Sequence, residues 1–178
     1  MSSFSDRVIR AMRLEKSLYE EVEADRTATG QAMAVVILNS VAGGIGFSGL
    51  SSLRTVFITT LLSLAIWVVS AVIIFIVGTR LLPAPETRSD PGELMRTIGF
   101  AQSPGLLYFL ALVPFAGWAV KLAVPLWLLA AWVIAVRQAL DYASTGRAVL
   151  VCVIGWLFYV GGIYLMTVLF AWIMALAV

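Results

Sequence analysis

The residue types in this chain leave few kinds of catalytic chemistry open. Among 178 residues there is no histidine, and Cys152 is the single cysteine. Histidine is the commonest general base and a frequent metal ligand, and structural metal cages need several thiolates or imidazoles. The sequence contains no glycine-rich phosphate loop, no paired-carboxylate site and no metal-ligand spacing. We therefore expect a protein that is not an enzyme and that uses no metal or cofactor.

Arginine supplies the chemistry that remains. Its guanidinium group binds phosphate and carboxylate oxygens, often through two parallel hydrogen bonds. One group of arginines opens the chain and another lies near its last quarter, where an aspartate accompanies it. The candidate residues for interaction with a partner or for lipid contact are Arg7, Arg10, Arg13, Pro104, Arg137, Asp141 and Arg147, and the arginines among them would bind a lipid phosphate or an acidic group of a partner.

For the second group, a purely structural role is the alternative. Arg137 and Asp141 are four residues apart, a spacing that suits an ion pair along a helix surface. Ser144 or Thr145 could cap the helix that follows. A polar pocket at a membrane surface and a set of caps and topology signals are both compatible with these residues, and the second is the simpler interpretation.

The composition places these residues in an integral membrane protein. Hydrophobic residues make up 61% of the chain and charged residues only 12%, whereas about a quarter of a soluble domain is charged. A membrane crossing needs roughly 17–25 residues. Five stretches are apolar enough, at about 31–50, 55–78, 99–118, 120–136 and 148–178. We predict an all-α five-transmembrane-helix bundle, and the small net charge of +2 argues against a nucleic-acid partner.

The basic residues predict how the bundle is oriented. If all five stretches cross, ten of the 12 Lys and Arg residues fall on one side of the membrane and two on the other. Basic residues accumulate on the cytoplasmic side of membrane proteins. We therefore expect a multi-pass protein of the bacterial inner (plasma) membrane, with its N-terminus in the cytoplasm and its C-terminus outside.

The last apolar stretch is too long for a simple crossing. As one helix, residues 148–178 would extend about 46 Å. We favour a single long helix that tilts or protrudes from the bilayer. The alternative is a break at Gly161-Gly162, which would return the C-terminus to the cytoplasm.

Residues 1–30 predict a cytoplasmic amphipathic helix that lies at the membrane interface. Its apolar residues share one face at helical spacing: Phe4, Val8, Ala11, Met12, Leu18, Tyr19 and Val22. This helix could pack on the cytoplasmic face of the protein itself. Alternatively, its arginines form a docking surface for anionic lipid or for a protein partner.

Small residues in the first apolar stretch predict close helix packing. Ser40 and Gly44, and Ala42 and Gly46, are pairs of small residues four positions apart. Such pairs let two helix backbones approach closely within a membrane. The spacing does not say whether the second helix belongs to this chain or to another subunit.

Pro104 interrupts a helix whose start is well defined. Asp90, Pro91 and Glu93 match a capping box, so a helix should begin at Pro91 and continue toward Trp118. We expect Pro104 to kink this helix and to leave the carbonyl of Phe100 without its donor. Gln102 or Ser103 could satisfy nearby backbone groups. The kink at Pro104 is a candidate pocket or partner site.

The region from Glu93 to Trp156 carries a recognisable pattern. Its features are Gly99-Phe100-Ala101, Pro104, Pro114, Trp127, the exit Val136-Arg137-Gln138-Ala139 and the return Ser144–Ala148, with the opening RVIRAMRLEKSLYEEVEAD. This pattern resembles the bacterial branch of the Yip (Ypt-interacting protein) domain family. The resemblance implies five transmembrane helices, a cytoplasmic N-terminus and no enzymatic activity. Eukaryotic relatives associate with small GTPases and have a long polar N-terminal region that is not seen here, so GTPase binding is not carried over.

These observations predict a protein that acts through contacts. We expect a scaffold or accessory subunit of a larger membrane assembly, or an organiser of lipid, whose partners are membrane lipids and other membrane proteins or further copies of the chain. The alternative is a small-solute permeation or transport protein with a polar path through Asn39, Ser40, Gln102 and Ser103. An enzyme acting on lipid or quinone ranks last, because no acid or base is identifiable.

Overall fold

The computed structural model describes residues 2–48, 53–113, 115–158 and 161, and their regular structure is helical. In chain order the elements are α1 (Phe4–Met12), α2 (Lys16–Ala24), α3 (Ala28–Ser48), α4 (Leu53–Ile76), the π-helical η1 (Val77–Leu81), α5 (Pro91–Phe100), the 3₁₀-helical η2 (Ser103–Leu112) and α6 (Gly117–Ala139). A further helix follows at Thr145–Phe158. The expected all-α class is confirmed.

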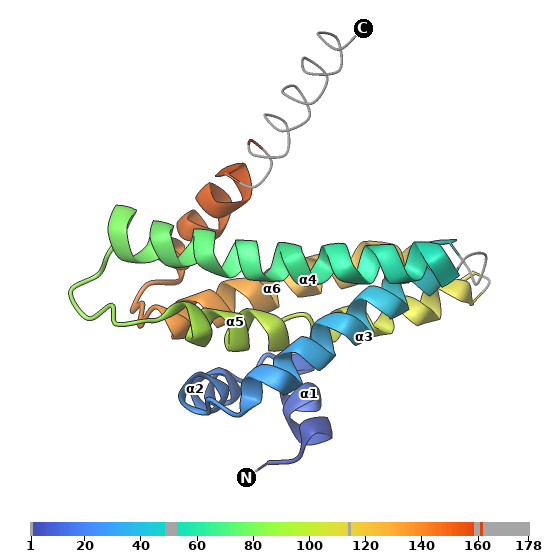
Figure 1. Ribbon diagram of the computed structural model, residues 1–178, viewed down its shortest axis with the longest axis horizontal. Coiled ribbons are helices and arrows are strands. Elements are labelled where there is room, and N and C mark those ends of the chain that lie inside the picture. The colour runs from blue at the N-terminus through green and yellow to red at the C-terminus, as the bar shows by residue number, and fades with distance from the viewer. Residues whose placement is uncertain (1, 49–52, 114, 159–160, 162–178) are drawn as a thin grey trace, which may run out of the picture.

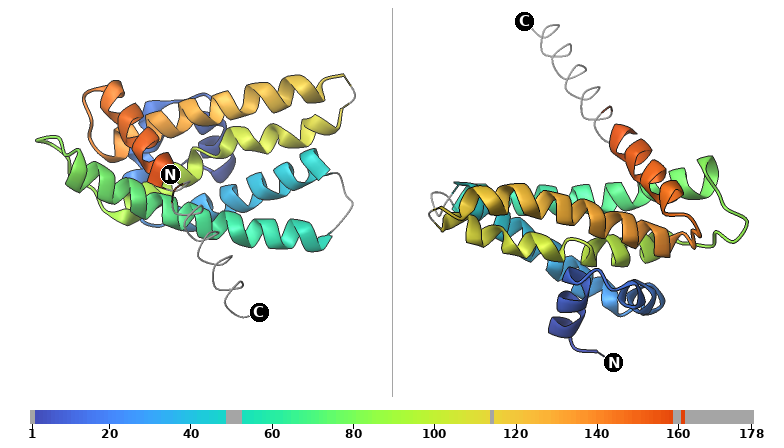
Figure 2. Two further views of the ribbon diagram at one scale, coloured as in Figure 1. Left: turned by 90° about the horizontal axis from the view of Figure 1, so that it is seen from above. Right: turned by 180° about the vertical axis from the view of Figure 1, so that it is seen from behind.

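The long helices form a bundle with helices attached on two opposite sides. α3, α4, η2 and α6 run along the long axis of the molecule, and α5 continues the line of η2 (Figure 1). α1 and α2, which we call the head together with the residues that precede α3, lie against one long side. The Thr145–Phe158 helix leaves the opposite side at an oblique angle (Figure 2). We call the end with residues 82–90 and 140–147 the charged end, and the end with residues 113, 115 and 116 the far end.

Three helices are long and apolar enough to cross a membrane: Ala28–Phe47, Val56–Leu81 and Gly117–Ala139. They correspond to the first, second and fourth predicted stretches, with the first beginning slightly earlier than expected. The last stretch begins as the Thr145–Phe158 helix. Whether it breaks at Gly161-Gly162 lies outside the described residues.

The third stretch differs from the expectation, because residues 99–118 do not form one helix. α5 ends at Phe100 and the chain continues as the 3₁₀ helix η2. Pro104 has no N–H to donate to the carbonyl of Phe100, and the Ser103 hydroxyl donates to that carbonyl instead, at 2.7 Å. The predicted loss of the donor is confirmed, but the consequence is a change of helix type rather than a kink. η2 packs against both α3 and α6.

The capping box at the start of α5 is confirmed. The Asp90 carboxylate accepts from the N–H groups of Gly92 (2.6 Å) and Glu93 (3.0 Å), and the Glu93 carboxylate accepts from Asp90 N–H at 2.9 Å. Pro91 occupies the first turn, where its missing N–H has no cost. The start of α5 is therefore fixed by local chemistry and its end by Pro104.

The head consists of two short helices instead of the single one expected. The chain reverses at Leu14, which adopts a left-handed conformation with φ 61°. The predicted apolar face is nevertheless confirmed, since its members pack into the interior of the molecule: Val8, Ala11, Leu18, Tyr19 and Val22 are buried, and Phe4 and Met12 contact the core. Two short helices bury this face better than one straight helix, because each can follow the surface of the bundle.

The small residues of α3 are used within the chain. Gly46 lies directly against the backbone of Tyr108 in η2, and Gly44 faces Val56 of α4. The hydroxyl groups of Ser40 and Ser63 are 3.2 Å apart, and Ala42 is buried. These contacts support the interpretation that this stripe packs helices of the same chain.

Replacing Gly46 by alanine should destabilise the protein, because the added methyl group would overlap the Tyr108 carbonyl. Overpacking of this kind costs about 1–3 kcal/mol. Reversible unfolding in mixed micelles would measure the change. Gly30 is the matched control in the same helix, since nothing lies within 4 Å of an added Cβ. Gly30→Ala should be neutral or stabilising by up to about 1 kcal/mol; equal losses for the two variants would contradict this packing.

Candidate functional site

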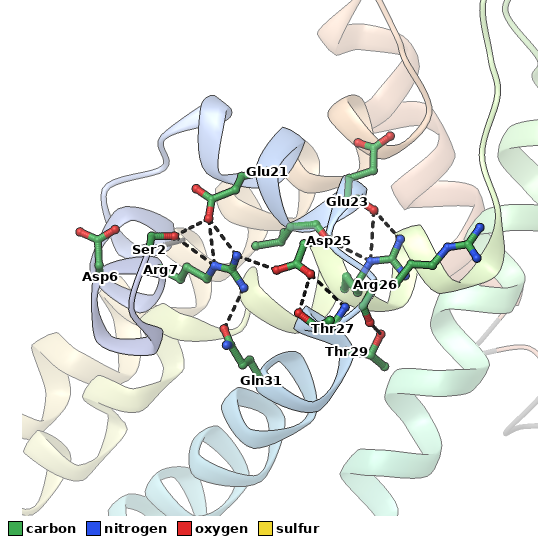
Figure 3. Close-up of polar contacts among 12 residues, drawn as sticks. Ser2, Asp6, Arg7, Glu21, Glu23, Asp25, Arg26, Thr27, Thr29 and Gln31 are labelled. Carbon is green, nitrogen blue, oxygen red and sulfur yellow. Dashed lines mark hydrogen bonds and ion pairs between the residues drawn. The ribbon is translucent and has the colours of Figure 1, made fainter.

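The most extensive polar cluster lies inside the head and is centred on Arg7. Its guanidinium is buried and pairs with Asp25 at 2.7 Å and Glu21 at 2.9 Å. It also donates to the Gln31 side-chain oxygen at 3.0 Å (Figure 3). Gln31 belongs to α3, so this cluster joins α1 and α2 to the first long helix.

Arg10 extends the same cluster on the surface of the head. It pairs with Glu21 at 2.5 Å, Glu15 at 3.1 Å and Asp6 at 3.7 Å. Of the three head arginines predicted to contact lipid or a partner, Arg7 and Arg10 thus meet carboxylates of the head itself. Arg13 is the exposed one.

The acidic members of the cluster are held ionised. A hydrogen bond from Ser2, together with Arg10 and Arg7, lowers the pKa of Glu21 to about 2. Hydrogen bonds from Thr27 and Arg7 lower the pKa of Asp25 to about 2. Because both values lie below those of the unpaired groups, the pairs stabilise the head above about pH 4. That stabilisation is lost as the pH falls toward 2.

Arg96 of α5 holds the end of α2. Its side chain is 5% exposed, and its Nε donates to the carbonyls of Val22 at 2.9 Å and Glu23 at 3.2 Å. The last carbonyls of a helix have no partner within the helix, so a cation there satisfies them and interacts favourably with the helix dipole. The sequence gives no indication of this role for Arg96, because its acceptors lie more than 70 positions away in the chain.

Two side chains of α6 also hold the head. The indole N–H of Trp127 donates to the Met12 carbonyl at 2.8 Å, at the end of α1. The Gln138 amide donates to the Glu20 carboxylate at 2.8 Å. The head is therefore attached to α3, α5 and α6 at several separate points.

An acidic cavity of about 560 Å³ lies where the head meets the charged end of the bundle. Its walls come from α2, the loop before α5, α5 itself and the end of α6. The charged side chains that line it are Glu20, Glu23, Glu86, Glu93, Arg137 and Asp141. Burial raises the pKa of Glu23 to about 7, with further contributions from Glu93 and Asp141 that Arg96 partly opposes.

The expected ion pair between Arg137 and Asp141 is wrong. α6 ends at Ala139, and Asp141 has a left-handed φ of 52°, so the two residues do not share a helix surface. Arg137 instead donates to the carbonyls of Tyr142 at 3.0 Å and Ala143 at 2.8 Å. It also donates to the Thr145 hydroxyl at 3.0 Å, so it organises the turn that precedes the Thr145–Phe158 helix.

The two remaining predicted site residues, Arg147 and Pro104, lie in different parts of the structure. Arg147 lines a neighbouring cavity of about 350 Å³ that Asp141 also borders, and it donates to the Pro83 carbonyl at 3.3 Å. Pro104 is buried inside the bundle. The structure thus brings Arg137, Asp141 and Arg147 together at the charged end, and places Arg7, Arg10 and Arg13 in the head.

An apolar groove was not foreseen from the sequence. It has a volume of about 560 Å³ and lies between α4, α6 and the Thr145–Phe158 helix. Its walls include Ile66, Ile74, Leu128, Trp132, Val153 and Trp156. Gly155 has no side chain and lies close to Ile74. The Thr145–Phe158 helix can therefore approach α4 closely at this residue. A lone glycine in an apolar run gives no indication of such a groove.

The polar residues of the alternative permeation path are paired with other side chains or with backbone. The Asn39 amide donates to the Gln102 side chain at 2.8 Å, Ser40 contacts Ser63, and Ser103 bonds Phe100. The three cavities described above have none of these four residues in their walls. Within the described ranges, no three His, Cys, Asp or Glu side chains are arranged to hold a metal ion.

No protein family, curated protein or solved structure matches this chain. The resemblance to the Yip domain family therefore remains a prediction from the residues that carry it.

Replacing Arg7 by glutamine should loosen the head, because Asp25 would lose its cation and Glu21 would keep only Arg10. Removing one partner of a buried ion pair costs roughly 3 kcal/mol or more; the partial exposure of both carboxylates reduces this to about 2 kcal/mol. Amide hydrogen exchange of residues 4–24 would report it. Arg13→Gln is the control and should change stability by less than about 0.5 kcal/mol; equal effects would contradict the cluster's role.

The attachment of the head should weaken as the pH rises. In the attached head, the pKa of Glu23 is about 7, above the ordinary value of 4.5. The attached state therefore binds the proton more tightly, and it loses stability between about pH 4.5 and 7. Hydrogen exchange of residues 16–24, corrected for the intrinsic pH dependence of exchange, should show falling protection over this range.

Glu23→Gln should abolish that pH dependence. Glu86→Gln is the matched control, since Glu86 lines the same cavity but does not contribute to the shift at Glu23. A wild-type head whose protection does not change with pH, or a Glu23→Gln variant that keeps the wild-type slope, would overturn this account.

Proposed function

We propose that this chain is a non-enzymatic membrane protein that acts through its surfaces, as a scaffold or accessory subunit of a larger membrane assembly or as an organiser of lipid. The observation that carries the proposal is the apolar groove beside the Thr145–Phe158 helix. That helix exposes large apolar residues on several sides: Val149, Leu150, Val153, Trp156, Leu157 and Phe158. A helix with an apolar surface all round needs lipid or another protein around it.

Five membrane crossings agree with this surface. α3, α4 with η1, and α6 are each long enough to cross. α5 and η2 together extend about 35 Å at the rises of α- and 3₁₀-helices, which also suffices. The helix that begins at Thr145 would be the fifth. The alternation of basic residues then puts the charged end and the head on the cytoplasmic side of a bacterial inner membrane.

Internal pairing of polar groups also supports a contact protein over a permeation protein. A solute path through the bundle needs Asn39, Ser40, Gln102 and Ser103 to face one opening. Instead, the Asn39 amide hydrogen bonds to Gln102, and Gly105 packs directly against the Asn39 side chain. Interhelical hydrogen bonds of this kind serve to hold membrane helices together.

Photo-cross-linking in native membranes would test the proposal. A benzophenone amino acid at position 153 faces the groove, and one at Phe57 is the control on the exposed far part of α4. We expect position 153 to give a discrete protein or lipid adduct that position 57 does not give. Native mass spectrometry from a gentle detergent should show the same bound component. A solitary monomer without bound protein or lipid, and no adduct specific to position 153, would contradict the proposal.

A further inference from the structure

The turn between α1 and α2 is fixed to the middle of α6. The Trp127 indole N–H donates to the carbonyl of Met12, which is the last residue of α1, at 2.8 Å. Trp127 is the eleventh residue of a helix that runs from Gly117 to Ala139. The head therefore lies along the side of the bundle rather than beyond its charged end, as Figures 1 and 2 both show.

α4 provides a scale for the level of this turn along the bundle. α4 and α6 run in the same direction, from the far end toward the charged end (Figure 1). Gly78 lies against Leu140, and Ile66 and Leu128 line the same groove. A residue of α4 is thus level with the residue about 62 positions later, which places Trp127 and the head turn level with Ala65.

The two sides of the bundle differ in how far their apolar surface extends. α4 and η1 expose apolar side chains well beyond Ala65 toward the charged end: Val68, Val69, Val72, Ile76 and Leu81. From Ala65 to Leu81 the distance is roughly 24 Å at 1.5 Å per residue. On α6 the last exposed large apolar residue is Leu129. Beyond it, Trp132 and Val133 face the groove and Gln138 contacts the head.

The turn itself carries two free cations beside apolar surface. Arg13 and Lys16 are exposed, and neither side chain has a hydrogen-bond or ion-pair partner among the residues that the structure describes. Ile9, whose carbonyl accepts from the backbone N–H of Arg13, is 48% exposed, and Trp127 is 36% exposed. A cation at the level of exposed leucines is costly in hydrocarbon unless an anionic group neutralises it. Cations beside tryptophan and aliphatic side chains are typical of the headgroup boundary of a bilayer.

We propose that the α1–α2 turn binds the phosphates of anionic lipids through Arg13 and Lys16, and that it brings these headgroups to the level of Trp127. The cytoplasmic leaflet is therefore displaced on the side of the head, while on the side of α4 it reaches Leu81. This inference rests on the proposed membrane function and gives it a lipid class and a location. The amphipathic surroundings favour a lipid over free phosphate, because Ile9 and Trp127 offer contacts to acyl chains.

Lipid retention measures the binding directly. Full-length protein in detergent would be titrated with phosphatidylglycerol or phosphatidylcholine and examined by native mass spectrometry. We expect the wild type to prefer phosphatidylglycerol over phosphatidylcholine. In the R13Q/K16Q variant this preference should be about tenfold lower. The R26Q/R88Q variant removes two other exposed arginines and should keep it, as should R13K/K16R. Millimolar inorganic phosphate should not displace the lipid.

The depth of the turn is tested by nitroxide labels at positions 16 and 76 in a C152S background, in bilayers containing phosphatidylglycerol. Ile76 lies about 16 Å nearer the charged end than the head turn. We nevertheless expect the label at 76 to be accessible to oxygen in hydrocarbon, and the label at 16 to be accessible to a water-soluble nickel complex.

Each failure has a distinct meaning. Equal losses in R13Q/K16Q and R26Q/R88Q, displacement by inorganic phosphate, or a label at 16 buried in hydrocarbon would overturn the inference while leaving the groove-based function intact. A preference for phosphatidylglycerol that persists in R13Q/K16Q would likewise overturn the inference and leave the groove-based function intact. Labels at both 16 and 76 in water would instead contradict the membrane placement on which the proposed function depends.

Discussion

The carbonyl groups at helix ends must find donors, and in this protein the donors come from other elements of the chain. The Trp127 indole donates to the carbonyl of Met12, at the end of α1. Arg96 serves the end of α2, and the Tyr142 hydroxyl lies within hydrogen-bonding distance of the carbonyls of Gly78 (2.9 Å) and Leu82 (2.7 Å), in and after the π-helical η1. Trp67 also donates to a carbonyl inside α5, that of Met95, at 2.9 Å. A buried carbonyl without a donor costs a large part of a hydrogen bond, more so away from water. Each of these bonds therefore also fixes the position of one element relative to another.

Pro104 determines how these elements are distributed. Because it ends α5, the line from Pro91 to Leu112 divides into an α-helical part that receives the head and a 3₁₀ part that packs on α3. The Asn39–Gln102 hydrogen bond and the contact of Gly105 with Asn39 lie at this division. The head, the bundle and the splayed Thr145–Phe158 helix leave two kinds of surface, an apolar groove on one side and a cationic turn on the other. The proposed contacts with lipid and protein rest on these two surfaces.

Local patterns in the sequence predicted local structure well. The capping box at Asp90, the apolar face of the head and the loss of the backbone donor to the Phe100 carbonyl all depend on residues within a few positions, and all are confirmed. The 3₁₀ form of η2 and the reversal at Leu14 were missed, because both depend on packing against distant helices. The burial of Arg7 was also missed, since its partners come from α2, the turn after it and α3. The Arg137–Asp141 pair failed because helix spacing says nothing about where α6 ends.

The head lies along the side of the bundle and is attached near the middle of α6. Cysteine cross-linking in membranes, in a C152S background with a short bifunctional thiol reagent, measures this position. We expect efficient cross-linking of R13C with L126C, which neighbours Trp127, and none of R13C with L81C at the charged end. Cross-linking of position 13 to position 81 and not to position 126 would instead place the head beyond the end of the bundle.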